Sequence, residues 1–151
     1  MFSKIYKFDL LIARTASLYG VGLERQLIHD VCKKLENKNF KFNGTGQEIR
    51  DWLHINDMCN LVYKFVLKDF KNINIINCGT GNGNKVKSVI EIIKKIYKIK
   101  NKIKYNKILD SNPSKMVANI SKAKKYNWKP TIFLKDGINE YVEWYKKKIK
   151  N

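Results

Sequence analysis

The 151-residue chain is poor in the residues that mark secreted, membrane or metal-dependent proteins. It has two prolines, two histidines and three cysteines. The spacing of Cys32, Cys59 and Cys78 fits no disulfide framework and no zinc motif, so we expect reduced thiols in the core and no metal site. No apolar run approaches the roughly 20 residues of a membrane span. Because residues 1–4 begin no signal peptide either, we expect a cytoplasmic protein that does not contact a membrane.

Arginine and acidic residues are also scarce. The formal net charge is +18, with 13 acidic residues against 31 basic ones, yet only Arg14, Arg25 and Arg50 are arginines. Nucleic-acid readers favour arginine because its planar fork pairs with phosphate and guanine. Lysine, asparagine and isoleucine are all encoded by AT-rich codons, so a codon bias explains the composition. The composition therefore does not favour binding to nucleic acid, and a basic nucleic-acid-binding module stays open as an alternative.

The hydrophobic pattern alternates between periods typical of strands and of helices, which predicts a mixed α/β chain. Short β-rich runs are bounded by turns, and apolar residues recur at helical spacing between them. We expect Asn56 or Asp57 to cap the second helix and Ser121 to cap the fourth. The predicted strands are 9–13, 40–42, 48–55, 73–76 and 102–109, and the predicted helices are 24–36, 58–68, 86–99, 122–126 and 134–148.

One glycine-rich segment invites comparison with a dinucleotide-binding loop. Residues 79–83 read Gly-Thr-Gly-Asn-Gly after a predicted strand. The dinucleotide fingerprint requires the spacing G-x-G-x-x-G, and no acidic residue ends a strand about 20 residues further on. The segment therefore predicts a strand-to-helix turn that needs positive φ rather than a phosphate cradle.

Four segments together resemble one family, the NAD-dependent epimerases and dehydratases among the extended short-chain dehydrogenases/reductases. Residues 14–20 resemble its R-x-x-N-x-Y-G stretch. Residues 43–57 are similar to its G-x-G-x-x-x-R-D-[FYW]-[VIL]-[HY]-[VI]-x-D block, and residues 76–81 to Y-N-x-G-x-G. Residues 121–130 resemble the closing S-K-A-x-x-x-L-G-W-x-P motif. The segments occur in the family's order and cover nearly the whole chain.

The resemblance implies only the second half of that family's fold. It predicts an α/β chain that forms the C-terminal part of an extended Rossmann-type fold, a single incomplete domain. Residues 1–22 would hold the last parallel strand and its loop, and residues 23–151 a small substrate-binding region. The family's G-x-x-G-x-x-G and Tyr-x-x-x-Lys motifs are not in the sequence. We therefore expect no catalytic residue here, with NAD bound mainly by a missing N-terminal part.

The resemblance further implies a nucleotide-diphosphate sugar as ligand. Arg50 matches the motif arginine and would contact the diphosphate, for which a guanidinium offers paired charge-assisted hydrogen bonds. The alternative is a structural pairing of Arg50 with Asp51. Ser17 replaces the family's asparagine as a candidate substrate contact. Lys115, near the place of a second family arginine, would supply a point charge.

Several further residues of these motifs have both a binding and a structural interpretation. Tyr19 would contact the substrate or pack on the end of a strand. Phe40 and Phe42 flank a strand that lies beside the base in relatives, but they also suit the core. His54 is expected as a hydrogen-bonded structural histidine and Asp57 as a helix cap.

The sequence thus predicts the nucleotide-sugar-binding half of an NAD-dependent nucleotide-sugar epimerase/dehydratase, inactive alone. A non-catalytic remnant is one alternative, and a split-enzyme subunit that needs a separate N-terminal half is another. A homodimer mate is also possible as a partner. The nucleotide, the sugar and the reaction subtype stay open.

Overall fold

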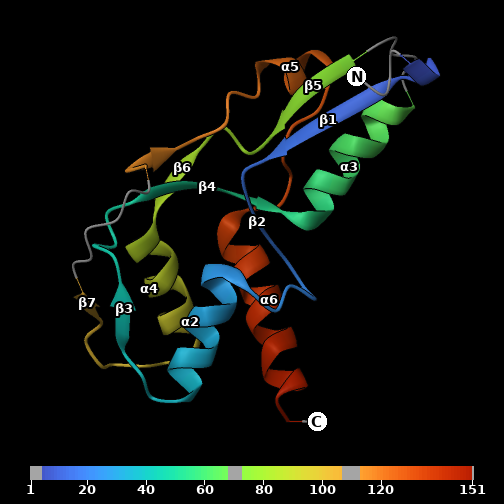
Figure 1. Cartoon of the computed structure of the whole chain (residues 1–151). Coiled ribbons are helices and arrows are strands. Elements are labelled where there is room, and N and C mark those ends of the chain that lie inside the picture. Colours follow the sequence, from blue (N-terminus) through green and yellow to red (C-terminus); the bar gives the residue numbers. More distant parts are fainter. Residues whose placement is uncertain (1–4, 68–72, 107–112, 151) are drawn as a thin grey trace.

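The computed structural model describes residues 5–67, 73–106 and 113–150, which form a mixed α/β structure (Figure 1). Short strands alternate with amphipathic helices along the chain, as the sequence pattern predicts. The strands are β1 (Leu10–Thr15), β2 (Ser17–Tyr19), β3 (Lys41–Asn43), β4 (Ile49–His54), β5 (Ile73–Cys78), β6 (Gly83–Lys85), β7 (Lys104–Asn106) and β8 (Lys115–Met116). The helices are α2 (Gln26–Glu36), α3 (Ile55–Val66), α4 (Val86–Ile96), α5 (Ser121–Lys125) and α6 (Leu134–Lys148).

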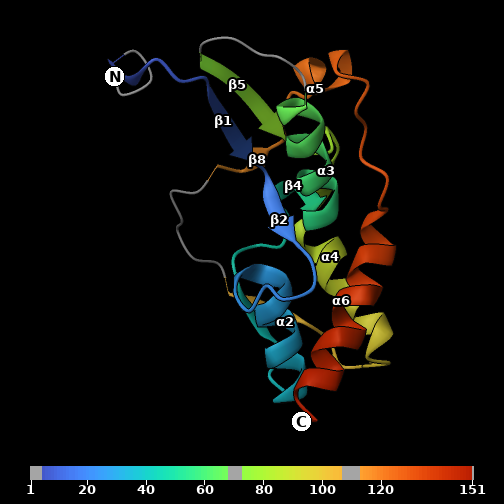
Figure 2. The same cartoon turned by 90° about the vertical axis from the view of Figure 1, so that its right-hand side faces the viewer.

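At one end of the molecule, β1 and β5 form a two-stranded parallel sheet. Leu11 and Ala13 of β1 and Ile76 of β5 pack against a core cluster that includes Leu61 and Phe65 of α3. These residues lie on one face of the sheet because side chains alternate along a strand. In Figures 1 and 2, α3 runs along this face of the sheet.

Strand β4 connects the two ends of the molecule and is the centre of a second sheet. It pairs in parallel with β2 and β8 and antiparallel with β6. Four of its six residues are buried, from Asp51 to His54. Its neighbours come from three distant parts of the chain, so β4 brings residues near 17, 84 and 115 together.

The other end of the molecule is built by three helices and a third small sheet. Helices α2, α4 and α6 pack on one another, and β3 pairs in parallel with β7 beside them (Figure 1). Each helix buries apolar residues at helical spacing. This second core is separate from the cluster under the β1–β5 sheet. It includes Val31, Cys32, Val89, Ile93, Ile138 and Tyr141.

Three strands of the structure were absent from the sequence-based prediction: β2, β6 and β8. Each has only two or three residues, and each pairs with β4. Residues 79–82 form a turn after β5, in which Gly81 has the predicted positive φ, 77°. The turn leads into β6 and not directly into a helix as a dinucleotide loop does, so the predicted strand-to-helix connection was wrong. Of the predicted strand 102–109, residues 104–106 are a strand, and 107–109 lie outside the described residues.

The predicted helix caps were wrong. The N-cap of α3 is His54, whose Nδ1 accepts a hydrogen bond from the backbone N–H of Asn56 at 3.3 Å. Asp57 is instead buried and accepts hydrogen bonds from the N–H groups of Thr131 and Ile132. Ser121 is the first residue of α5 and makes no capping bond with its side chain. The N-cap is the residue between the end of the strand and the first turn of the helix. The local sequence does not fix where β4 ends, so it could not identify His54 as the cap.

The proposed division after residue 22 remains a prediction. The sheet that contains β1 also contains β5, from the second predicted region, so packing joins the two regions. Among the described residues, no helix is both long and apolar enough to cross a membrane.

Candidate functional site

Arg50 is the second residue of β4, half-buried, and lies opposite Asn84 of β6 and Met116 of β8. Its Nη1 donates a hydrogen bond to the carbonyl of Ile49 at 2.9 Å. No ion pair joins Arg50 to a carboxylate within the described part of the chain. The guanidinium is therefore anchored at one nitrogen and keeps donors for an anionic ligand.

The structural pairing of Arg50 with its neighbour Asp51 does not occur. The Asp51 carboxylate is buried and accepts hydrogen bonds from Thr80 N–H (2.8 Å), Thr80 Oγ1 (2.6 Å), Gly81 N–H (3.0 Å) and Ala118 N–H (3.2 Å). Successive strand residues point to opposite faces, so the two side chains are directed apart. Asp51 thus ties the turn after β5 and the segment after β8 to the strand that carries Arg50.

Two adjoining cavities meet at Arg50. Their volumes are about 580 Å³ and about 570 Å³, and Ser17, Gln26 and Arg50 line both. Lys115 and Asn77 line the first cavity, together with Arg14 and Asn119. The second is lined by Asn43, Gly44, Thr45, Gln47, Glu48 and Trp52, among others. Together they form a groove of a size suited to a small organic anion, with Arg14, Arg50 and Lys115 as cationic and Glu48 as acidic lining residues.

A tight turn shapes the second cavity. The Glu48 carboxylate accepts hydrogen bonds from the N–H and the Oγ1 of Thr45, both at 2.8 Å. Partial burial acts to raise the pKa of Glu48, but these bonds outweigh it and lower that pKa below its usual value. Glu48 is thus held ionised and keeps the turn against β4.

The structure brings three of the six predicted binding residues together. Ser17, Arg50 and Lys115 line the same cavity, although they are far apart in the chain. The pairing of β2 and β8 with β4 is what unites them.

The three predicted aromatic contacts lie elsewhere. Tyr19 is buried, its ring edge-on to that of His54 with centroids 5.2 Å apart. Phe42 is buried in the helical core, and Phe40 packs against that core. None of the three lines either cavity at Arg50, so their structural interpretation describes them better.

The lining residues of the first cavity that were not predicted as binding residues from sequence include Arg14, Gln26, Asn77 and Asn119. Arg14 and Asn77 lay within motif segments, and the rarity of arginine was a signal for Arg14. Arg14 pairs with Asn77 across the β1–β5 sheet, where both strands end. Gln26 has φ of 69°, an unusual backbone for a residue other than glycine at the start of a helix. Nothing in the local sequence singles out Asn119.

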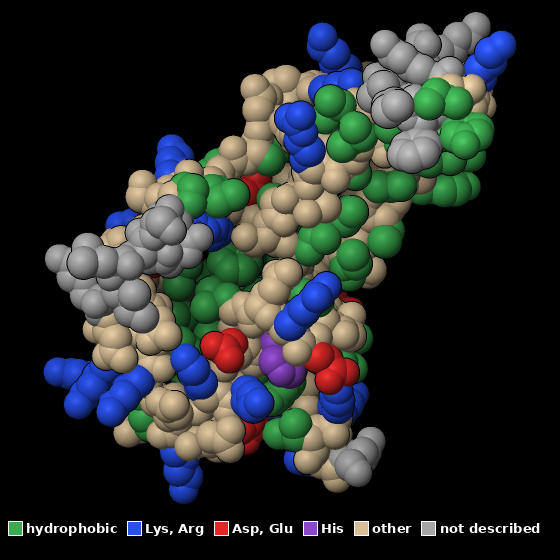
Figure 3. Space-filling view, in the orientation of Figure 1, with side chains coloured by type: hydrophobic (Ala, Val, Ile, Leu, Met, Phe, Trp, Pro, Cys, Tyr) green, Lys and Arg blue, Asp and Glu red, His purple; other side chains and the backbone are tan. Residues whose placement is uncertain are grey.

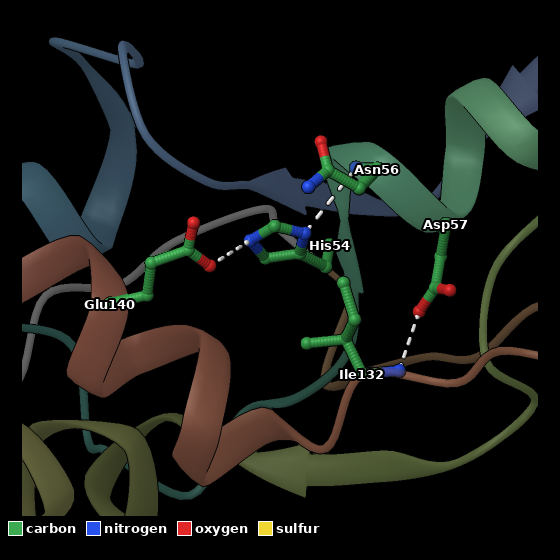
Figure 4. Close-up of polar contacts among 5 residues, drawn as sticks. All are labelled: His54, Asn56, Asp57, Ile132 and Glu140. Carbon is green, nitrogen blue, oxygen red and sulfur yellow. Dashed lines mark hydrogen bonds and ion pairs between the residues drawn. The ribbon is translucent and has the colours of Figure 1, made fainter.

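His54 is the structural residue that the sequence predicts (Figure 4). Its ring is 2% exposed, and because Nδ1 accepts the Asn56 N–H, the neutral ring carries its proton on Nε2. Nε2 lies 3.3 Å from a carboxylate oxygen of Glu140 on α6. Asp57, three residues after His54, accepts a hydrogen bond from the N–H of Ile132 in the segment before α6. Both residues fasten α6 and do not face the groove.

Neither one large cationic patch on the face in Figure 3 nor a cluster of metal ligands in the described residues marks a second site. Lysine and arginine side chains are scattered over the face in Figure 3 rather than gathered into one patch. The described residues contain no group of three or more histidine, cysteine or acidic side chains that could hold a metal ion.

Comparison with known protein families shows which family this chain and its groove belong to. Residues 2–79 match the sequence model of the "NAD dependent epimerase/dehydratase family". The chain belongs to this family. The matched region includes Arg14, Ser17 and Arg50, and the groove therefore lies in a member of the NAD dependent epimerase/dehydratase family.

Curated members of the family resemble the chain over nearly all of its length. A putative UDP-glucose 4-epimerase from Methanocaldococcus jannaschii is 28% identical over 97% of the chain and 48% of the relative. A UDP-glucuronate 4-epimerase from Thermodesulfobacterium geofontis is 30% identical over 96% and 46%. The chain spans about half the length of the curated relatives it matches, and corresponds to their C-terminal half.

Solved structures of the family show the same fold. An epimerase from Methanothermobacter thermautotrophicus superposes with a TM-score of 0.89 at 20% identity, over 99% of this chain and 46% of that one. A dTDP-glucose 4,6-dehydratase from Bacillus anthracis, solved in complex with NAD, gives 0.85 at 27% identity over 99% and 48%. The fold is therefore the C-terminal part of a Rossmann-type epimerase.

The glycine turn of this chain does not fit the pyrophosphate of NAD. A dinucleotide loop offers free N–H groups at a helix N-terminus. Here the N–H groups of Thr80 and Gly81 are both bound to the Asp51 carboxylate, whose negative charge would repel a phosphate. The family's cofactor is NAD, so its pyrophosphate must be bound by residues other than this turn.

Proposed function

We propose that this chain is the nucleotide-sugar-binding half of an NAD-dependent nucleotide-sugar epimerase or dehydratase. The observation that carries the proposal is Arg50, a half-buried guanidinium without a carboxylate partner among the described residues, at the junction of two cavities. Arginine binds a diphosphate through paired charge-assisted hydrogen bonds. Lys115 adds a second positive charge, and Ser17 offers a hydroxyl. The names of the curated relatives support a nucleoside-diphosphate sugar as the ligand.

Equilibrium binding of UDP-glucose, with GDP- and dTDP-linked sugars in parallel, tests this proposal. We expect Arg50→Ala to weaken binding about ten- to hundred-fold, because a hydrogen bond to a charged group contributes about 1.5–3 kcal/mol. Arg50→Lys should recover only part of the affinity, since lysine lacks the planar fork. Arg25→Ala is the matched control, because Arg25 is exposed and lines neither cavity at Arg50. Equal losses in the Arg25 and Arg50 variants would contradict the proposal.

The chain alone is expected to be inactive. Hydride transfer requires a bound nicotinamide and a proton donor. No tyrosine in the sequence is followed by lysine at the fourth position. Tyr141 donates its hydroxyl to the carbonyl of Leu23 at 2.5 Å in the core, where burial raises the pKa of its phenol well above the usual value. Formation of NADH from NAD by the purified chain, with any of these sugars, would refute this expectation.

The nucleic-acid alternative makes a different prediction in the same assay. A basic module binds duplex DNA with an affinity that falls steeply with salt. Under our proposal any such binding is weak and is unchanged by Arg50→Ala, because the lysines are spread along the whole sequence and are scattered on the face in Figure 3. DNA binding that is tighter than sugar-nucleotide binding at physiological salt would favour the alternative.

A further inference from the structure

A second kind of cavity lies beside β3 and β7, at the helical end of the molecule (Figure 1). Its volume is about 630 Å³, a size typical of small-ligand pockets. We call it the lysine cavity, because its described lining consists of four lysines, two asparagines and a phenylalanine: Lys38, Lys41, Lys102, Lys104, Asn39, Asn101 and Phe40. None of these residues lines either cavity at Arg50, so the lysine cavity is separate from the groove.

Two segments that are far apart in the sequence form the lysine cavity. Lys41 begins β3 and Lys104 begins β7, and the register of this parallel pair places them directly opposite each other. The N–H of Lys104 donates a hydrogen bond to the carbonyl of Phe40 at 2.8 Å. In the turn after α2, Asn39 Oδ1 accepts the backbone N–H of Lys41 at 3.0 Å. Hydrogen-bonded backbone therefore holds the lysines of the two segments next to one another.

No carboxylate of the described residues neutralises these lysines. All four are exposed, and none of the ion pairs in the described part of the chain involves one of them. Like charges directly opposite each other on neighbouring strands are destabilising. An anion bound between Lys41 and Lys104 would relieve that repulsion, so their arrangement favours a bound anion.

Neither codon bias nor a helix dipole accounts for the position of these lysines. A codon bias raises the number of lysines but does not place them around one cavity. A helix dipole favours lysines in the last turn, and α2 already has two there. Lys41, Lys102 and Lys104 belong to no helix. Lys38 follows the C-cap of α2 with φ of 53°, a position where glycine or asparagine is usual.

The chemistry of the lysine cavity matches clustered phosphate groups. Lysine binds phosphate as a point charge, without the planar fork of arginine. Several ammonium groups around one cavity therefore favour a ligand that carries several negative charges close together. The side-chain amides of Asn39 and Asn101 add N–H donors, and Phe40 adds an apolar wall. A nucleic acid would instead need a continuous basic stripe, which the scattered lysines on the face in Figure 3 do not form.

We propose that the lysine cavity binds a small soluble ligand with two or more clustered phosphate groups. This site is additional to the groove at Arg50. The proposal does not rest on the proposed function, because the two sites share no described lining residue.

Inorganic tripolyphosphate is the probe, added to the whole chain at physiological salt without any nucleotide sugar. Isothermal titration calorimetry measures its affinity, and NMR shift changes of backbone N–H groups locate it. We expect shift changes at residues 38–41 and 101–104 that persist in Arg50→Ala. Orthophosphate should bind at least about tenfold more weakly, because a single phosphate cannot make charge-assisted hydrogen bonds to all of these lysines at once.

A double variant tests the lysines directly. Lys41→Gln combined with Lys104→Gln should weaken tripolyphosphate binding at least about tenfold, since hydrogen bonds between charged groups are the strong ones. Its melting temperature should be equal or higher, because a like-charge pair is removed. The matched control is Lys124→Gln combined with Lys135→Gln. It changes the net charge equally at exposed sites on α5 and α6 that do not line the cavity, and it should bind tripolyphosphate almost as the parent chain does.

Several results would overturn the proposal. Equal losses in the two double variants, or equal affinities for tripolyphosphate and orthophosphate, would indicate attraction by net charge alone. Binding that survives the Lys41 and Lys104 changes and is lost in Arg50→Ala would place the anion in the groove. Tighter binding of duplex DNA, or of vesicles with anionic phospholipids, that is lost in the Lys41 and Lys104 variant would assign the cavity to a larger polyanion. UDP-glucose binding that depends on Arg50 can hold or fail independently of each result.

Discussion

At the scale of single residues, Arg50 and Asp51 are neighbours on β4 with different roles at the groove. Arg50 faces the cavities, while Asp51, on the opposite face of the strand, holds the segments that build the cavity wall. A buried carboxylate is stable only when its oxygens are well supplied with donors. The four donors around Asp51 meet that condition, so its role is structural support for the position of Lys115 and Arg50.

Replacement of Asp51 by alanine should therefore lower both stability and ligand binding. Donors of Thr80, Gly81 and Ala118 would lose their acceptor in a buried site. We expect the free energy of unfolding to fall by about 2–4 kcal/mol, since a hydrogen bond to a charged group contributes about 1.5–3 kcal/mol. Urea denaturation measures this loss in the free energy of unfolding. Asp51→Asn should lose less because one acceptor oxygen remains.

The control for this prediction is Asp30→Ala on α2. Asp30 is exposed and forms only a surface ion pair with Lys34 at 3.6 Å, an interaction that contributes about 0–1 kcal/mol. An Asp51→Ala protein as stable as the Asp30→Ala protein would show that the carboxylate does not support the groove.

At the scale of elements, α6 is placed by close contact with β2 and β4. Gly137 lies in the first half of this helix, beside Tyr19 and His54. A Cβ at this glycine would lie 2.5 Å from the Tyr19 hydroxyl and 2.9 Å from His54 Cδ2. The helix can approach the strands only because no side chain intervenes. The contact of Glu140 with His54 and the hydrogen bond from the N–H of Ile132 to Asp57 lie at the same junction (Figure 4).

Gly137→Ala should consequently destabilise the protein, although alanine is the better helix former by about 1 kcal/mol. Overpacking of a tight contact costs about 1–3 kcal/mol. We therefore expect a net loss in the free energy of unfolding and a lower melting temperature. Lys135→Ala, at an exposed site on the same helix, is the control and should be neutral. A stabilised Gly137→Ala protein would mean that α6 can move away from β2 at little cost.

At the scale of the whole molecule, the chain has two hydrophobic cores, and they differ in how well the surrounding elements shield them from solvent. The core around α2, α4 and α6 is enclosed by helices, whereas the core under α3 lies behind a sheet with one open face. Each core contains one buried cysteine, Cys32 in the first and Cys78 in the second. The expectation of a core thiol was wrong for Cys59, which is exposed. Burial raises the pKa of Cys32 to about 12 and also raises the pKa of Cys78. The reactivity of Cys32 and that of Cys78 therefore measure the opening of each core separately.

We expect a thiol reagent at neutral pH to modify one cysteine rapidly in the native protein and all three in the unfolded protein. The thiolate is the reactive form, and burial disfavours it at Cys32 and Cys78. In mild urea Cys78 should react before Cys32, because a two-stranded sheet with an open face is the less stable unit. Mass spectrometry of modified peptides gives the order. Simultaneous reaction of both would show that the two cores unfold as one unit.

The longer elements could be predicted from sequence because their pattern is local. Residues 134–148 were predicted as a helix with the bounds that the structure shows, and the helix at 26–36 was predicted from 24. Three of six predicted binding residues line the groove, and these are the polar ones. The aromatic candidates Tyr19, Phe40 and Phe42 are packed in or against the core, because an aromatic ring in a motif serves packing as readily as binding.

Local sequence patterns were enough to predict the α/β class, the main helices and the family, and the scarcity of arginine drew attention to Arg50. Which residues meet depends on the tertiary structure. Strands β2, β6 and β8 are too short to be recognised from their own composition, since they exist only as partners of β4. The groove, the buried Asp51 and the lysine cavity all depend on contacts between distant segments. A local sequence pattern contains no information about those contacts, because they form only when the chain has folded.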